Sequence, residues 1–173
     1  FNLKTTVDAA PAMTSEKNIA LFEEMGVLSR VEVMSRYEVI IEHYAKVLHI
    51  EAMTMLEMAN KQLIPAATAY MSDVASAAAA KMAVSEKLSC KAENKVLEKL
   101  SAATDAMSDA VDALDAAVES AESETDSLEK AKAYRDKVLP AMADLRTNAD
   151  AAEVVCGEDY WPLPSYSKML YYV

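Results

Sequence analysis

The chain has 173 residues, of which 53% are hydrophobic and 26% are charged, and its formal net charge is −11. This composition suffices for one domain with a hydrophobic core and excludes a disordered chain. The negative charge argues against a nucleic-acid partner, because phosphate groups repel an acidic surface. No stretch approaches the roughly 18 uninterrupted apolar residues that a membrane span needs, so we expect a cytoplasmic protein without membrane contact.

Short helices are expected at the start of the chain. With only two glycines in the sequence, few hairpin turns are available, which indicates an all-α fold. Thr5, three residues before Asp8, predicts the cap of a first short helix. Thr14 is expected to cap a second helix that runs to about Met25, where Gly26 can adopt the left-handed conformation that closes a helix.

A long helix over about 30–88 is predicted from the clearest start signal in the sequence. Ser29 and Glu32 have the spacing of a capping box. Pro65 should kink this helix rather than end it. Apolar residues spaced by three and four define its inner face: Met34, Tyr37, Ile41, Tyr44, Leu48, Ala52, Met55, Ala59 and Leu63. A second set widens that face, so that two sides of the helix can be covered: Ile40, Val47, Ile50 and Met58.

A second helix over about 92–122 follows a heptad pattern. Its apolar seam is formed by Leu97, Leu100, Thr104, Met107, Val111, Leu114, Val118, Ala121, Thr125 and Leu128. A displaced stripe follows it: Ala131, Tyr134, Val138, Met142, Leu145, Ala149, Ala152 and Cys156. Such a slip in phase indicates either a turn or local overwinding of one continuous helix. We favour a turn within 120–127, with Asp126 or Ser127 as the N-cap of a third helix to about 156. The alternative is one long helical hairpin.

The second helix is strongly acidic. Eight Asp and Glu residues and no Lys or Arg lie between residues 101 and 127. The ordinary interpretation is a solvated helix face that aids solubility. The alternative is a free-standing acidic helical adaptor that binds a basic protein partner.

We expect no catalytic, cofactor-binding or metal-binding residue in the chain, which would then not be an enzyme by itself. A phosphate-binding loop needs several glycines, and the sequence has no such loop. His43 and His49 are six residues apart, which places them on different faces of a helix. Cys90 and Cys156 lack metal-ligand spacing and are expected to be reduced thiols.

The tail, residues 157–173, differs in composition from everything before it. It contains the only tryptophan and two of the five prolines. Large apolar side chains on a restricted backbone lose little entropy on docking, which predicts a docking tail. Its docking residues are Tyr160, Trp161, Pro162, Leu163, Pro164 and Tyr166. The target is either the chain's own helices or another part of a larger assembly. The tail completes one predicted domain, with short helices over 1–28 and an elongated antiparallel helical bundle over 29–156.

The tail sequence Trp161-Pro162-Leu163-Pro164-Ser165-Tyr166 resembles the C-terminus of type III glutamine synthetases. Three further stretches resemble the helical region of that family in the same order: residues 18–29 followed by 35–38, residues 50–66, and residues 134–142 with 145–146. The resemblance covers nearly the whole chain, with a generic composition over about 72–127. It implies that the chain, which begins at Phe1, is a piece of a longer enzyme.

The family resemblance implies an upstream catalytic domain that joins ammonia to glutamate with ATP and a divalent metal, Mg or Mn. The motifs of that domain are absent from this sequence, so no catalytic or metal role transfers to any residue here. The resemblance also implies a large double-ring homo-oligomer. We therefore expect a non-catalytic C-terminal scaffold and assembly domain, whose partners are its own catalytic domain and sister subunits.

Overall fold

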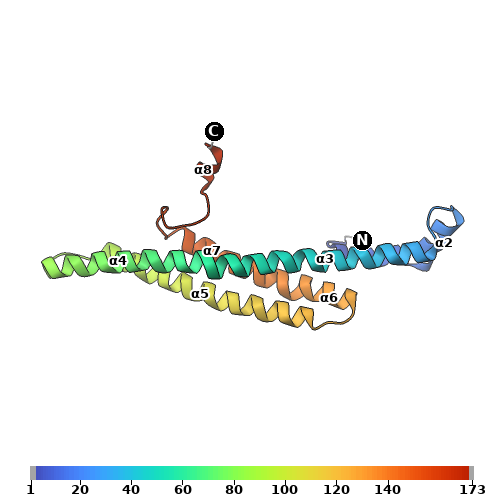
Figure 1. Cartoon of the computed structure of the whole chain (residues 1–173), viewed down its shortest axis with the longest axis horizontal. Helices are drawn as coiled ribbons and strands as arrows, with labels where there is room; N and C mark the ends of the chain where they lie inside the picture. Colours follow the sequence, from blue (N-terminus) through green and yellow to red (C-terminus); the bar gives the residue numbers. More distant parts are fainter. Residues whose placement is uncertain (1–2, 172–173) are drawn as a thin grey trace. The chain divides into compact units, whose positions relative to one another are not determined.

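The computed structural model describes residues 3–171, and all regular elements in this range are helical (Figure 1). The predicted all-α fold is therefore confirmed. The chain divides into two compact units. Unit 1 comprises residues 1–53 and 115–141, and unit 2 comprises residues 54–114 and 142–173.

Ten helical elements succeed one another in the described part of the chain. They are α1 (Thr6–Met13), α2 (Glu16–Glu24), α3 (Arg30–Met58), the π-helical turn η1 (Ala59–Leu63), α4 (Ile64–Val84), α5 (Lys91–Glu122), α6 (Ser127–Ala133), the π-helical turn η2 (Tyr134–Val138), α7 (Leu139–Glu153) and α8 (Tyr166–Leu170). Between α5 and α6, the carboxylate of Asp126 caps α6 by accepting the amide of Glu129 at 2.9 Å. The predicted turn is thus confirmed, and the single long hairpin is wrong. The arrangement of the long helices as one antiparallel bundle stays a prediction.

The first two helices meet at two adjacent residues that can both act as caps. The hydroxyl of Thr5 accepts the amide of Asp8 at 3.2 Å and caps α1, as predicted. The prediction for Thr14 is wrong, because α2 begins after Ser15 instead. Thr14 belongs to the end of α1, where its hydroxyl donates to the carbonyl of Pro11 at 3.0 Å. That carbonyl lies in the last turn of α1, where backbone acceptors lack helical partners.

The start of α3 follows the predicted signals. Gly26 has a φ of 64°, the left-handed conformation expected after the end of α2. The amide and hydroxyl of Ser29 each donate to the Glu32 carboxylate at 2.8 Å, and the Glu32 amide donates back to the Ser29 hydroxyl at 3.4 Å. The capping box is therefore confirmed.

Unit 1 has a small core between α1, α3 and α6. The cluster consists of the buried residues Val7, Ala10, Ile41 and Ala131, with Tyr37, Tyr44 and Leu128 packed against it. The inner face of α3 differs from the prediction at its start, since Met34 is 40% exposed and Val33 is fully buried. The predicted second side of the helix is largely open in this structure, because Ile40, Val47 and Ile50 are exposed.

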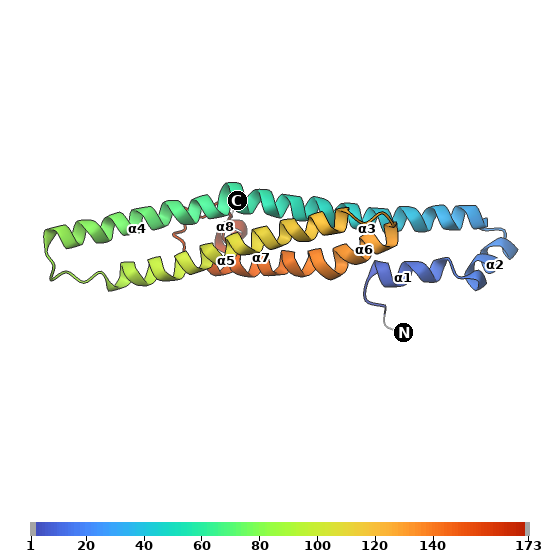
Figure 2. The same ribbon diagram turned by 90° about the horizontal axis from the view of Figure 1, so that it is seen from below.

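Unit 2 contains α4 and the first part of α5, which lie side by side and are joined by residues 85–90 (Figure 2). Lys81 forms an ion pair with Glu93 across this pair of helices. The thiol of Cys90 donates to the carbonyl of Ala78 at 3.6 Å. Both contacts fix the connection, and α4 ends at Val84 rather than near residue 88.

Both prolines within the long helices follow a π-helical turn. Pro65 comes two residues after η1 ends at Leu63, and Pro140 comes two residues after η2 ends at Val138. Proline lacks the amide proton and its ring clashes with the carbonyl four residues before it. The wider turn relieves that clash. Pro65 therefore does not end the helix, as predicted.

The predicted seam of α5 is buried at Leu100, Thr104, Met107, Val111, Leu114, Val118 and Ala121. The displaced stripe that follows is buried at Ala131, Tyr134, Val138, Leu145, Ala152 and Cys156. The hydroxyl of Thr104 donates to the carbonyl of Leu100 at 2.7 Å, so this polar group is satisfied within its own helix. Thr125 was expected in the seam but is exposed, because α5 ends at Glu122.

The two serine caps of unit 1 provide a matched test of the α3 start. Ser29→Ala removes the hydroxyl of the capping box and should cost about 1 kcal/mol, which lowers the thermal midpoint by about 2–4 °C. Ser15→Ala is the control, since Ser15 precedes α2 without a side-chain capping hydrogen bond. Circular dichroism measures both midpoints. Equal midpoints for the two variants would contradict the role of the capping box.

Candidate docking surface

The tail begins in unit 2 with one turn built on Gly157. The carbonyl of Gly157 accepts the amides of Tyr160 and Trp161 at 3.0 and 3.1 Å. This turn redirects the chain after α7, and Figure 1 shows α8 standing away from the other helices of unit 2. The predicted irregular tail is therefore interrupted by a short helix.

Tyr160 fixes the first part of the tail to α4. Its ring lies 5.1 Å from that of Tyr70, measured between centroids, and its hydroxyl donates to the carboxylate of Asp73. This hydrogen bond raises the pKa of Tyr160 above its ordinary value. A Cβ atom on Gly157 would lie 3.1 Å from the ring of Tyr70 and 3.3 Å from that of Tyr160, so a residue without a side chain fits best between them.

The predicted docking residues divide into two groups. Tyr160 is half-buried and Trp161 is only 8% exposed, so these side chains pack within unit 2. Pro162, Pro164 and Tyr166 are exposed. Leu163 is half-buried at the edge of an open groove. Part of the tail thus packs on the chain's own helices, and docking of the rest onto a partner stays a prediction.

The groove beside the tail has a volume of about 580 Å³ and lies entirely within unit 2. Its apolar wall is formed by Met55, Met58, Leu63, Leu145, Leu163 and Met169. Arg146, Asp150 and Glu153 add polar groups along α7. An open, mainly apolar groove with charged groups along one side suits a helix or an extended apolar segment.

Unit 1 contains a polar network that the sequence did not reveal. The ring of Tyr134 is fully buried, and its hydroxyl donates to the carboxylate of Glu122 at 2.6 Å. Nδ1 of His49 lies 2.8 Å from the same hydroxyl. Because the hydroxyl proton is used by Glu122, Nδ1 of His49 must be the donor. Lys130 lies 3.4 Å from Glu122, so one network joins α3, α5 and the α6–η2 segment.

The network shifts the pKa of two of its members. The hydroxyl of Tyr134, with Lys130 and His49, lowers the pKa of Glu122. Burial and the nearby Glu122 carboxylate raise the pKa of Tyr134. An open cavity of about 470 Å³ adjoins the network, and its two lysines are each paired with a glutamate, Lys46 with Glu42 and Lys130 with Glu122. The arrangement suits a structural tie between helices.

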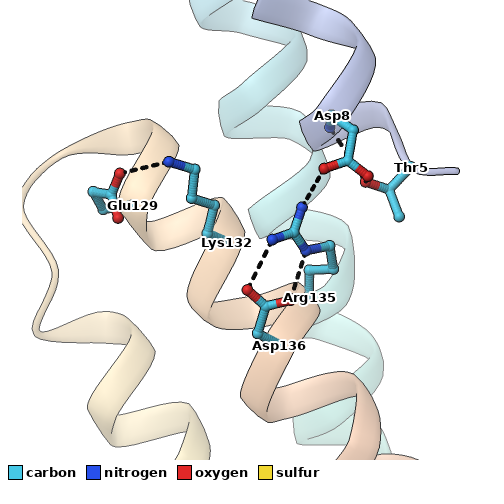
Figure 3. Close-up of polar contacts among 6 residues, drawn as sticks. All are labelled: Thr5, Asp8, Glu129, Lys132, Arg135 and Asp136. Carbon is cyan, nitrogen blue, oxygen red and sulfur yellow. Dashed lines mark hydrogen bonds and ion pairs between the residues drawn. The ribbon is translucent and has the colours of Figure 1, made fainter. Parts of the chain in front are cut away.

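A second polar network within unit 1 holds α1 against η2 (Figure 3). Arg135 donates to both carboxylate oxygens of Asp136, at 2.6 and 2.8 Å, and to Asp8 of α1 at 2.5 Å. The hydroxyl of Thr5 donates to the other oxygen of Asp8 at 2.8 Å. The carboxylates raise the pKa of the Arg135 guanidinium above its ordinary value. Arg135 therefore fixes α1 against η2.

Among residues 3–171, no cluster of three or more His, Cys, Asp or Glu side chains is placed to hold a metal ion. No helix of the described range combines the length and apolar character required to cross a membrane. Both cysteines are free thiols.

The chain is similar to glutamine synthetases along nearly its whole length. A family model described as the glutamine synthetase C-terminal domain matches residues 1–82. The chain is 36% identical over 170 residues to the glutamine synthetase of Butyrivibrio fibrisolvens and 29% identical over 174 residues to the type-3 glutamine synthetase of Dictyostelium discoideum. The glutamine synthetase of Bacteroides fragilis is 23% identical over 174 residues. Each comparison covers 98% of this chain but 24% of the relative, so the chain spans about a quarter of their length.

The turn at Gly157 can be tested with the single tryptophan. Gly157→Ala should push apart the rings of Tyr70 and Tyr160 and loosen the adjacent Trp161, which would shift its fluorescence emission to longer wavelength. Gly26→Ala is the control, because a methyl group there meets no atom within 4 Å and lies in unit 1. Its strained φ should lower stability without moving the emission maximum of the folded protein. An unchanged emission maximum for Gly157→Ala would show that the turn does not hold Trp161.

The pKa of Glu122 predicts how the unit 1 network responds to acid. A lowered pKa in the folded state means that the network stabilises the fold above the unfolded pKa of about 4.3. This contribution is lost as pH falls through the lowered pKa of the folded state. Urea unfolding followed by circular dichroism should show a larger difference between the parent chain and Glu122→Gln at about pH 6 than at about pH 3.

Glu119→Gln, at an exposed position of the same helix, is the control for this experiment. It alters the net charge by the same amount as Glu122→Gln. A pH-dependent effect of equal size in both variants would assign it to general charge and not to the network.

Proposed function

We propose that this chain is a member of the glutamine synthetase C-terminal domain family and forms a non-catalytic scaffold and assembly domain of a type III glutamine synthetase. The observation that carries the proposal is the similarity over 98% of the chain to relatives about four times as long. The parent enzyme would join ammonia to glutamate with ATP. Its catalytic residues and its Mg or Mn ions would lie in the remaining three quarters of the polypeptide.

The polar contacts within the chain support a scaffold role. His49, Glu122 and Tyr134 satisfy one another between helices, and Arg135 satisfies Asp8 and Asp136. Such groups are occupied in holding helices in place. A reaction centre needs a nucleophile, base or metal directed at an open site.

The tail and its groove support an assembly role. Tyr160 holds the tail on α4, while Tyr166 and Met169 present apolar surface that is 79% and 54% exposed. The groove beside them has an apolar wall of the kind that receives helices in protein complexes. We propose that this surface contacts a sister subunit or the catalytic domain of the same enzyme. The parent enzyme is proposed to act in the cytoplasm, which the two free thiols fit.

Removal of the chain from the full-length enzyme tests the proposal. We expect the truncated enzyme to lose its normal ring assembly, measured by analytical ultracentrifugation, because a contact surface between subunits is missing. The isolated chain should neither bind ATP in calorimetry nor produce glutamine. Normal assembly together with normal activity in the truncated enzyme would contradict the scaffold role, and ATP binding by the isolated chain would contradict its non-catalytic character.

A double substitution in the tail tests the docking surface more finely. Tyr166→Ala with Met169→Ala removes exposed apolar side chains and should weaken the assembled state without altering the helical content of the isolated chain. Val84→Ala with Val154→Ala is the matched control in the same unit, since these valines are 81% and 86% exposed and do not line the groove. An equal effect of both pairs would assign the loss to general surface change.

A further inference from the structure

One side of α3 in unit 1 presents large apolar residues that no described helix covers fully. Val31 is 77% exposed, Val39 is 63% exposed and Ile40 is 37% exposed. Val39 lies between Val31 and Ile40 around the helix, and all three side chains line one open cavity. Burial of one valine or isoleucine side chain stabilises a structure by about 1.5–3 kcal/mol. The exposed side chains on this side of α3 do not make that full contribution.

This side of α3 lines an open cavity of about 600 Å³ within unit 1. Met13, from the last residue of α1, forms part of the wall, and Ser35, Glu32 and Arg36 contribute polar groups from α3. Glu32 is already engaged in the capping box. The cavity therefore combines an apolar surface with a position next to the first helix of the chain.

We propose that this α3 face, defined by Met13, Val31, Val39 and Ile40, is the docking site for the part of the same polypeptide that precedes residue 1 in the parent enzyme. The inference rests on the proposed function. It adds a second contact surface in unit 1, separate in sequence from the tail in unit 2.

The length of the relatives identifies the occupant. The chain covers 24% of each relative, which leaves about three quarters of a relative outside this structure. The family model that matches residues 1–82 is described as a C-terminal domain, and on that ground we place the missing part before residue 1. That part must join unit 1 through α1, because α1 is the first helix of the chain.

The attachment of α1 keeps the preceding part close to the cavity. Arg135 binds Asp8, and the apolar residues Val7 and Ala10 pack in the core of unit 1, so α1 is fixed. α1 has 8 residues, which corresponds to a length of about 12 Å, and Met13 at its end lines the cavity. A segment tethered at such a short distance has an effective concentration in the millimolar range. Contact within one polypeptide is therefore favoured over contact with a second copy.

A photo-crosslinking amino acid at position 39 of the full-length enzyme tests the contact. We expect ultraviolet light to join position 39 to a peptide upstream of residue 1 in the same polypeptide, as identified by mass spectrometry. The same amino acid at position 84, which is 81% exposed at the end of α4 in unit 2, should give no such product. An uncrosslinked position 39, or a product that joins two polypeptides through this face, would overturn the proposal.

Val39→Glu provides a second readout that does not depend on crosslinking. In the isolated chain it should leave the thermal midpoint unchanged within about 2 °C, because Val39 is exposed there. In the full-length enzyme it should raise the rate of protease cleavage near residue 1 several-fold, and Val84→Glu should not. An unchanged cleavage rate would overturn the proposal.

These results separate this inference from the proposed function. Altered ring assembly after removal of the chain, together with an uncrosslinked position 39, would leave the scaffold role standing and refute the α3 docking site. Unchanged assembly together with a crosslink upstream of residue 1 would support the α3 docking site and contradict the scaffold role.

Discussion

The use of alanine in the interior is the constraint on which both units depend. Buried alanines occur at positions 10, 45, 52, 59, 67, 78, 110, 121, 131, 133 and 152. Alanine allows helices to approach closely, but one buried methyl group contributes only about 0.8 kcal/mol, against about 1.5–3 kcal/mol for a larger apolar side chain. A core of this kind must therefore extend along many helical turns. It also tolerates few unsatisfied polar groups, and Thr104 meets that requirement by bonding within its own helix.

Long helices must then remain continuous where the sequence contains proline. The π-helical turns before Pro65 and Pro140 provide this continuity, since α4 and α7 follow them without a break. The second of these turns also carries the two polar ties of unit 1. Its first residue, Tyr134, contacts Glu122 and His49, and its second, Arg135, contacts Asp8. One irregular turn thus accommodates a proline and connects α1, α3 and α5.

Features that depend on residues close in sequence could be predicted, and those that depend on distant residues could not. The capping box at Ser29 and the turn at Asp126 are set by neighbours within three positions. Errors of one position arose where two neighbours were chemically equivalent, as with Thr14 and Ser15 or Val33 and Met34. The contact of His49 with Tyr134 joins residues 85 apart, and that of Tyr160 with Asp73 joins residues 87 apart, so no local pattern signals them. For the same reason the division of the tail into a packed and an exposed part was not predictable.

In this chain, many buried residues are small, whereas several large apolar residues are exposed. This distribution indicates which residues serve folding and which serve association. Single exposed apolar residues are common on protein surfaces and need no explanation. In this chain, large exposed apolar residues are grouped. Val31 and Val39 lie on α3, and Tyr166 and Met169 line the groove of unit 2. The interior, in contrast, holds many alanines. A chain selected only to fold alone would gain more by the reverse placement, because larger side chains contribute more when buried. The placement is understandable if close alanine packing defines the helical frame and the larger side chains are reserved for contacts with the rest of an enzyme. On this view the stability of the frame and the strength of its contacts are set by different residues, and each can vary without loss of the other.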